Sequence, residues 1–251
     1  MRLAIIGALI AASACTSANG NESGNGGNST SGGSEGVQTG SAGQRNFDVG
    51  AFQSVSLAGA HDVIVTVGGP PSVRAEGNAE ALERLEVRVE GGVLRLETRR
   101  DSWFSGGSRG SVTVHVTAPS LNGASIGGSG DMRIDRVQAE AFESSISGSG
   151  DLEIGTLQAR RVEFSVTGSG DIRASGAAEE AEISIAGSGS VELDSLQVRR
   201  ASVSIAGSGD VAIQASEAVD GSIMGSGHVT VRGAARCSVT KMGSGEIRCG
   251  D

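Results

Sequence analysis

The sequence predicts an all-β protein whose single domain, residues 44–251, is a parallel β-solenoid with coils of about 18–20 residues. First, the triplet GSG begins at positions 128, 148, 168, 187, 207, 225 and 243, so its copies recur every 18–20 residues. Second, apolar and polar residues alternate on both sides of the triplets, which is typical of strands with one buried face. Third, the chain has 41 Gly but only five Phe, one Trp and no Tyr, so aliphatic side chains on a regular backbone must form the core.

The N-terminal stretch MRLAIIGALIAASAC has the layout of a secretory signal peptide, with one positive residue, an apolar run and small residues before Cys15. We expect residues 1–15 to be this signal, with Cys15 as the lipidated residue of a bacterial lipobox. Ordinary cleavage after Ala14 remains the alternative. Either way the protein is expected to be exported from the cytoplasm. With the lipid it would be a cell-envelope protein, namely an outer-membrane lipoprotein that is periplasmic or surface-facing.

Residues 16–43 consist almost entirely of Gly, Ser, Asn and Thr, a composition that buries too little apolar surface to fold. We expect a disordered linker that tethers the domain to the membrane anchor. The net charge of −9 and the scarcity of aromatic residues argue against nucleic acid as a partner, because neither phosphate-neutralising nor base-stacking groups are abundant.

Alignment on GSG shows apolar columns on both sides of the triplet. The apolar positions lie two and six residues before it and two and four residues after it, and the second of the two later columns contains Ile134, Ile154, Ala174, Leu193, Ile213, Val231 and Cys249. A weaker column seven residues after the triplet contains Val137, Leu157, Ala177 and Leu196. Such a small unit cannot cover its own apolar face, and stacked units bury that face against one another, so a solenoid follows. An antiparallel sandwich of hairpins is the alternative.

The GSG triplets themselves are interpreted as corners between strands. A sharp corner needs backbone angles that are strained for residues with a Cβ atom, so glycine on both sides of a small serine allows the turn in every coil. Gly170, the second glycine of its triplet, is expected to have such a positive φ angle.

Residues 47–121 are expected to continue the same architecture without the motif. The stretches VSLAGAHDVIVTVGG, LEVRVEGGVLRLET and SVTVHVTAP alternate apolar and polar residues and end at Gly or Pro. The stretch NAEALERL predicts one helical turn capped by Asn78, before a strand containing Leu85, Val87 and Val89. The stretch SWFSGGSRG, residues 102–110, predicts a protruding loop.

The stretches FQSVSLAGAHDVIVTVG and TAPSLNGASIGGSGDMRI, together with the recurring GSGD, resemble the putative auto-transporter adhesin, head GIN domain family, over about residues 47–250. The resemblance implies a bacterial envelope protein with a right-handed β-helix. It supplies no catalytic residue that could be carried over to this chain.

The residue after GSG is acidic in most coils, which places Asp131, Asp151, Asp171 and Asp210 in one column at the strand spacing. A hard cation such as calcium would relieve their mutual repulsion, which makes this column a weak candidate metal site. The favoured interpretation is that each carboxylate accepts hydrogen bonds from corner amides and faces water, since Ser190 interrupts the column.

No residues converge on a reaction, and no catalytic residue, cofactor or metal is predicted. The three histidines, His61, His115 and His228, lack metal-ligand spacing, and His115 alternates with valines as on the exposed face of a strand. GSGD lacks the following helix that a phosphate loop requires.

Four arginines, Arg160, Arg161, Arg199 and Arg200, are expected at one corner two coils apart. They could form an anion-binding stripe, although a solvated corner is the favoured interpretation.

Cys237 and Cys249 are predicted to form a disulfide. Cys237 lies six residues before the last triplet and Cys249 four residues after it, so both occupy apolar columns on strands that meet at one corner. Two buried free thiols are the alternative.

Taken together, the sequence predicts a non-catalytic, structural or adhesin-like interaction module, with a carbohydrate-active or anion-binding β-helix protein as the alternative. The partner would be an envelope or extracellular protein or a glycan, with membrane contact through the lipid anchor.

Overall fold

The computed structural model describes residues 42–99 and 110–250, all of which belong to one compact unit, Thr39–Asp251. The expected signal peptide, most of the linker and nearly all of the loop at 102–110 therefore lie outside the described residues. In the described part of the chain, no helix has the length and apolarity needed to cross a membrane.

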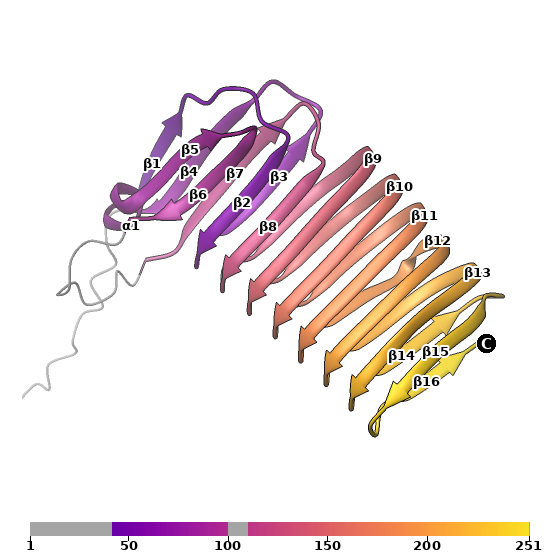
Figure 1. The fold of residues 1–251 in the computed structure, drawn as a ribbon. Helices are drawn as coiled ribbons and strands as arrows, with labels where there is room; N and C mark the ends of the chain where they lie inside the picture. Colours follow the sequence, from indigo (N-terminus) through magenta and orange to yellow (C-terminus); the bar gives the residue numbers. More distant parts are fainter. Residues whose placement is uncertain (1–41, 100–109, 251) are drawn as a thin grey trace, which may run out of the picture. The chain divides into compact units, whose positions relative to one another are not determined.

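Five long strands form the regular part of the fold, and each runs through one coil from one GSG corner to the next (Figure 1). Every strand pairs in parallel with the following one, and residues at equivalent repeat positions face each other, as Leu152 faces Met132 and Ile172. The parallel β-solenoid is thereby confirmed, and the alternative sandwich of hairpins is wrong. The strands are β9 (Met132–Gly148), β10 (Leu152–Gly168), β11 (Ile172–Gly187), β12 (Ser190–Gly207) and β13 (Asp210–Gly225).

The apolar columns form the core between the walls of the coils. Nearly all members of the columns on either side of the triplet are buried as expected, including Phe142, Ile154 and Val191. The third column differs at one coil, because Gly176 rather than the exposed Ala177 faces Leu157. This coil is one residue shorter than the preceding coil. The residue that faces Leu157 therefore lies six rather than seven positions after the triplet, although the two strands stay paired.

The corners depend on both glycines of the triplet, for different reasons. The first glycine has a positive φ angle in every coil, as at Gly148 (140°) and Gly168 (127°). Gly170 does not have a positive φ angle, so the expectation for this residue was wrong. A Cβ atom added to Gly170 would lie within 3.0 Å of the carbonyl oxygen of Gly150 and of Cγ2 of Ile146. The second glycine is therefore required by the close approach of the preceding coil.

The middle serine of the triplet ties each corner to the previous one. The backbone N–H of Ser169 donates to the carbonyl oxygen of Gly148 at 2.8 Å, and the N–H of Ser188 donates to that of Gly168 at 2.8 Å. The corners thus stack at the same spacing as the strands, which is why a side chain at either glycine would collide with the neighbouring corner.

The first coils are not stacked in sequence order. Strands β2 (Ser54–Gly59) and β3 (Asp62–Val67) form a coil between two others. Strands β6 (Val93–Thr98) and β7 (Val112–Ala118) pair in parallel with its outer side, and β8 (Gly123–Gly128) and β9 pair with its inner side. The second coil in the sequence, β6 and β7, therefore lies on the N-terminal side of the first coil, and all later coils lie on its other side.

Three strands near the N-terminus are antiparallel, so the expectation of one uniform architecture over residues 47–121 was wrong there. β4 (Ser72–Asn78) pairs with β7, β1 (Ala42–Phe47) pairs with β4, and β5 (Leu85–Glu90) pairs with β6. The β5–β6 hairpin forms because Gly91 and Gly92 both have positive φ angles, 59° and 79°, in a two-residue turn.

The predicted helical turn is confirmed as α1 (Ala79–Arg84), with β5 directly after it. The side-chain Oδ1 of Asn78 accepts hydrogen bonds from the N–H groups of Glu80 (3.0 Å) and Ala81 (3.2 Å), which caps the helix as expected. Ala81 and Leu82 form the buried face of this helix.

The C-terminal end consists of shorter and less buried strands. β14 (His228–Arg232) pairs with β13, β15 (Arg236–Met242) pairs with β13, and β16 (Glu246–Cys249) pairs with β14, all in parallel. A disulfide joins Cys237 to Cys249, with their Cα atoms 6.4 Å apart. Cys237 is half-buried and Cys249 is exposed, so the staple lies at the open end of the core rather than inside it.

Candidate interaction surface

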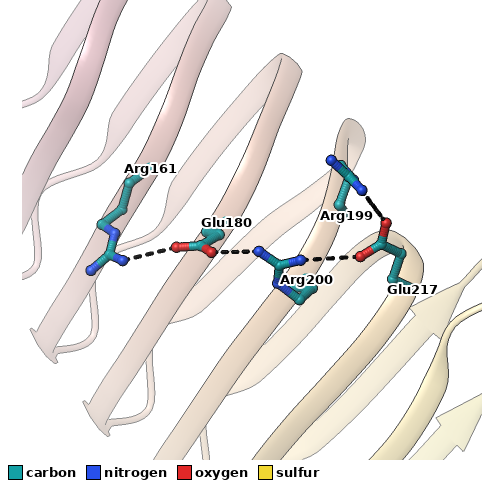
Figure 2. A network of polar contacts seen from close by, with 5 residues as sticks. All are labelled: Arg161, Glu180, Arg199, Arg200 and Glu217. Atoms are coloured by element: carbon teal, nitrogen blue, oxygen red, sulfur yellow. Dashed lines mark hydrogen bonds and ion pairs between the residues drawn. The ribbon is translucent and has the colours of Figure 1, made fainter.

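A chain of alternating charges crosses four coils at one edge of the solenoid (Figure 2). Glu180 lies between Arg161 (2.9 Å) and Arg200 (2.6 Å). Arg200 also contacts Glu217 at 3.2 Å, and Glu217 accepts a hydrogen bond from Nε of Arg199 at 2.8 Å. The parallel register places Arg161, Glu180 and Arg200 side by side in adjacent coils, and Glu217 precedes Ala218, the residue aligned with Arg200.

Every charged side chain of the network contacts at least one of opposite charge, although its two glutamates are shared by three arginines. Hydrogen bonds from Arg200 and then Arg161 lower the pKa of Glu180, and a hydrogen bond from Arg199 lowers the pKa of Glu217. Arg160 is paired outside the network, with Glu140 at 2.9 Å. All four arginines that could have formed an anion-binding stripe are thus engaged by carboxylates, which is the solvated corner that the sequence favoured.

A second column of charges lies on the strands that follow the GSG corners. Arg133 pairs with Glu153 at 3.1 Å, and Arg173 pairs with Glu192 at 2.9 Å. All four side chains face outward, as the alternation with the buried columns predicted. These pairs are exposed and screened by water, so each contributes little to stability and mainly keeps the face free of unpaired charge.

The carboxylates of the aspartate column accept hydrogen bonds from backbone N–H groups. Oδ1 of Asp131 accepts the N–H of Asp151, and Oδ1 of Asp151 accepts the N–H of Asp171, both at 3.0 Å. Asp171 accepts the N–H of Ser190 at 2.9 Å, and Asp210 accepts that of His228 at 3.0 Å. Each carboxylate therefore caps the next coil, which is the favoured interpretation of this column. No three His, Cys, Asp or Glu side chains of the described residues are grouped as a metal site would require.

The histidines are separate from one another and have different partners. His115 faces outward and its Nε2 lies 3.2 Å from Oε1 of Glu76, while Nδ1 of His228 lies 3.0 Å from Oδ1 of Asp210. His61 is 6% exposed, and its Nε2 lies 2.9 Å from Oγ1 of Thr98. Burial lowers the pKa of His61, against a smaller opposing effect of Asp62, so its ring is neutral near pH 7.

The position of His61 reveals a corner that the sequence pattern does not mark. The register aligns Gly59 with Gly128 and Val63 with Met132, so Gly59-Ala60-His61-Asp62 is the equivalent of a GSGD corner. Counting GSG triplets misses this corner because only its first and last residues match the motif.

A shallow groove of about 560 Å³ runs along β10–β13 beside the charged network, with which it shares Arg199. We call it the axial groove, since it crosses successive coils in the direction in which they stack. Sequence reasoning did not single it out, because its lining is made of ordinary Gln and Ala residues. The signal that could have found it is a column of glutamines seven residues after the aspartate column, which includes Gln138 and Gln158, two residues that the register aligns.

The fold and its side-chain columns define a parallel β-solenoid with repetitive outer faces, on which arginines pair with carboxylates of neighbouring coils. The model of the putative auto-transporter adhesin, head GIN domain family matches residues 51–235, and the chain belongs to this family. None of the curated proteins compared with the chain matches it.

Solved structures of the same fold include proteins from Bacteroides and Parabacteroides species. A putative adhesin from Bacteroides fragilis NCTC 9343 has a TM-score of 0.74 at 23% identity, and the match covers 83% of this chain and 97% of that one. A putative lipid binding protein from Parabacteroides distasonis ATCC 8503 has a TM-score of 0.68 at 24% identity, with 84% and 97% covered. A putative adhesin from Parabacteroides merdae ATCC 43184 has a TM-score of 0.63 at 16% identity, with 84% and 96% covered. At these identities the similarity shows the fold alone.

Proposed function

We propose that this protein is a non-catalytic interaction module of the bacterial cell envelope. Residues 1–15 would direct export, Cys15 would carry a lipid, and residues 16–43 would let the solenoid domain, residues 44–251, reach beyond the membrane surface. Membership of an adhesin-like family and the layout of the N-terminal sequence support this proposal.

One structural observation carries the proposed interaction role: outward side chains repeat in register from coil to coil. A column of hydroxyl groups runs across one face, since the register aligns Ser145, Ser165, Ser184, Ser204 and Ser222. A stacked array of identical groups offers a partner many equivalent contacts at the strand spacing, about 4.8 Å. Extended solenoid surfaces bind partners in this way, because the affinity is distributed over several coils.

Attachment of beads tests the interaction role. The chain from residue 15 onward, carrying the substitution Cys15→Ser, would be coupled to beads. The beads would then be incubated with surfaces coated with extracellular proteins or glycans. We expect saturable attachment to at least one surface, competed by the soluble chain. Attachment no greater than that of beads carrying an unrelated β-solenoid would contradict the proposal.

Membrane fractionation tests the tether separately. Cys15→Ala is expected to move the protein from the membrane fraction to the soluble fraction, whereas Cys237→Ala should leave it with the membrane. An unchanged distribution of the Cys15→Ala variant would refute lipid anchoring at this residue.

Incubation with acidic polysaccharides tests the non-catalytic part of the proposal. We expect no new reducing ends or unsaturated products with polygalacturonate or alginate. Product formation that depends on the folded chain would replace the proposal with the carbohydrate-active alternative.

A further inference from the structure

The axial groove is built from three aligned rows of side chains. Its floor is a row of small apolar residues, because the register places Ala159 beside Ala178, Ala178 beside Val198 and Val198 beside Ala215. The last three of these are buried, and Ala159 is half-buried. The floor is therefore apolar, narrow and continuous over four coils.

One wall of the groove is a row of amides. The register aligns Gln158, Ala177, Gln197 and Gln214, all of which line the groove. Within residues 42–99 and 110–250, the three glutamine side chains make no hydrogen bond to the protein, although each offers two N–H donors and a carbonyl acceptor. These amides are consequently available to a ligand at intervals of one or two strand spacings.

The opposite wall contains an unpaired carboxylate. Arg199 in this wall is bound to Glu217, but Glu179 has no ion pair or hydrogen bond to any described residue. The wall therefore offers one free carboxylate as an acceptor for hydroxyl or N–H groups, while the Arg199 guanidinium is held by Glu217.

We propose that the axial groove binds a linear, uncharged oligosaccharide lying along the stacking direction of the coils. Sugar hydroxyls both donate and accept hydrogen bonds, and so do the free amides of the wall, while the Glu179 carboxylate accepts from a pair of hydroxyls. The less polar side of the sugar rings would lie on the alanine and valine floor. An extended pyranose chain advances by about one strand spacing, roughly 5 Å, per residue, so successive sugars would meet equivalent groups on successive coils.

The alternatives fit the groove less well. An extended peptide is recognised chiefly through a free strand edge, and here the backbone groups of β10–β13 are already paired between neighbouring coils. An anionic chain would face the Glu179 carboxylate without a free cation to offset it, since Arg199 is engaged.

This inference rests on the proposed interaction role and names the ligand class of that role. The groove spans three strand spacings between Gln158 and Gln214, roughly 14 Å, which corresponds to about three to four sugar units. Affinity should thus rise with chain length and then level off once the groove is full.

Titration calorimetry or ligand-observed NMR with the mature full chain would test this. The probes are linear β-1,4-glucan, α-1,4-glucan and β-1,4-mannan oligosaccharides of two, four and six units. For at least one series we expect affinity to rise about tenfold from disaccharide to tetrasaccharide and less than about twofold from there to hexasaccharide. Absence of binding by all three series, or binding without dependence on length, would overturn the inference.

Substitutions at one position give opposite predictions. Ala177 interrupts the amide row between Gln158 and Gln197. Ala177→Gln completes the row and should raise affinity for the hexasaccharide about threefold, whereas Ala177→Arg obstructs the wall and should lower it at least about tenfold. Ala186→Arg is the matched control, because Ala186 is equally exposed but does not line the groove, and its affinity should equal that of the wild type.

The variants also separate this inference from the proposed function. Equal affinities of Ala177→Arg and wild type, with both proteins folded by circular dichroism, would place the sugar elsewhere and refute the groove as the site. If beads attach to a protein-coated surface while no oligosaccharide binds, the interaction role holds and the sugar inference fails.

Discussion

The two ends of the solenoid are closed in different ways. At the N-terminal end, β4 and β5 pair in antiparallel fashion with the outermost coil, and α1 packs against β1 and β4 (Figure 1). Ala81 and Leu82 of α1 are buried. At the C-terminal end, nothing in the described residues lies beyond β15 and β16. Val239 and Ile247 remain half-buried there, and Met242 is 71% exposed.

The difference shows two ways to end a solenoid in which every coil could pair with a further coil. The N-terminal end covers the core with folded elements that cannot continue a parallel stack. The C-terminal end instead changes its side chains: Lys241 occupies the column that contains Ile205 and Ile223, and its Nζ donates to the carbonyl oxygen of Gly245 at 2.9 Å. A charge in an apolar column discourages the addition of another strand, and the disulfide compensates for the lost packing.

The largest effect is expected for a corner glycine inside the stack. Gly170→Val would push a branched side chain against the carbonyl of Gly150 and should destabilise the domain by about 3 kcal/mol or more. Gly245→Val makes the equivalent contact with Gly227, but only in the last coil, so it should disturb that coil and spare the rest. Urea unfolding combined with hydrogen exchange measures the loss of stability in each variant. Equal losses in the global free energy of unfolding would show that the last coil unfolds together with the central coils.

The next effect concerns the staple at the C-terminal end. Reduction, or the double change Cys237→Ser and Cys249→Ser, should cost about 3 kcal/mol, as expected for a short loop. Because the bond joins only β15 to β16, faster hydrogen exchange should be confined to these strands and should not reach β9–β12. Mass spectrometry of alkylated, non-reduced protein from the exported fraction provides the control, and free thiols at both cysteines there would contradict the disulfide.

A smaller effect is expected in the aspartate column. Asp151→Ala removes the acceptor of the Asp171 N–H and should cost about 1 kcal/mol. Asp210→Ala, nearer the C-terminal end and 58% exposed on its side chain, should cost less. Millimolar calcium should leave the melting temperature of the wild type unchanged, whereas a rise that disappears in Asp151→Asn would establish the metal site instead.

The regular coils could be predicted from the sequence because each residue position there repeats its environment. The buried columns, the outward Arg133 and Glu153, and the Asn78 cap all follow from local patterns. The reversed order of the first coils could not be predicted, because the alternation of polar and apolar residues in β2, β3, β6 and β7 shows that each is a strand but not which strand lies beside it.

The surface was harder to predict than the core. For Arg160, Arg161, Arg199 and Arg200 the sequence favoured a solvated corner over an anion-binding stripe, but it did not identify their partners. Those partners, Glu140, Glu180 and Glu217, lie in neighbouring coils and become neighbours only through the stacking of the coils. Gly170 illustrates the same limit: the sequence shows that glycine is required, whereas only the stacked backbone shows that the preceding coil, and not the φ angle, requires it.

The smallest predicted effect is the dependence of stability on pH near the N-terminal end. His61, in the unmarked corner near the N-terminal end, has a pKa lowered from 6.5 chiefly by burial. As pH falls below 6.5, the unfolded chain binds a proton at this residue more readily than the folded chain, so the folded state loses stability. His61→Gln removes the titration and should make the free energy of unfolding less dependent on pH between 7 and 5, a window above the range in which the carboxylates titrate. An unchanged slope in His61→Gln would show that this buried ring does not control the acid stability of its coil.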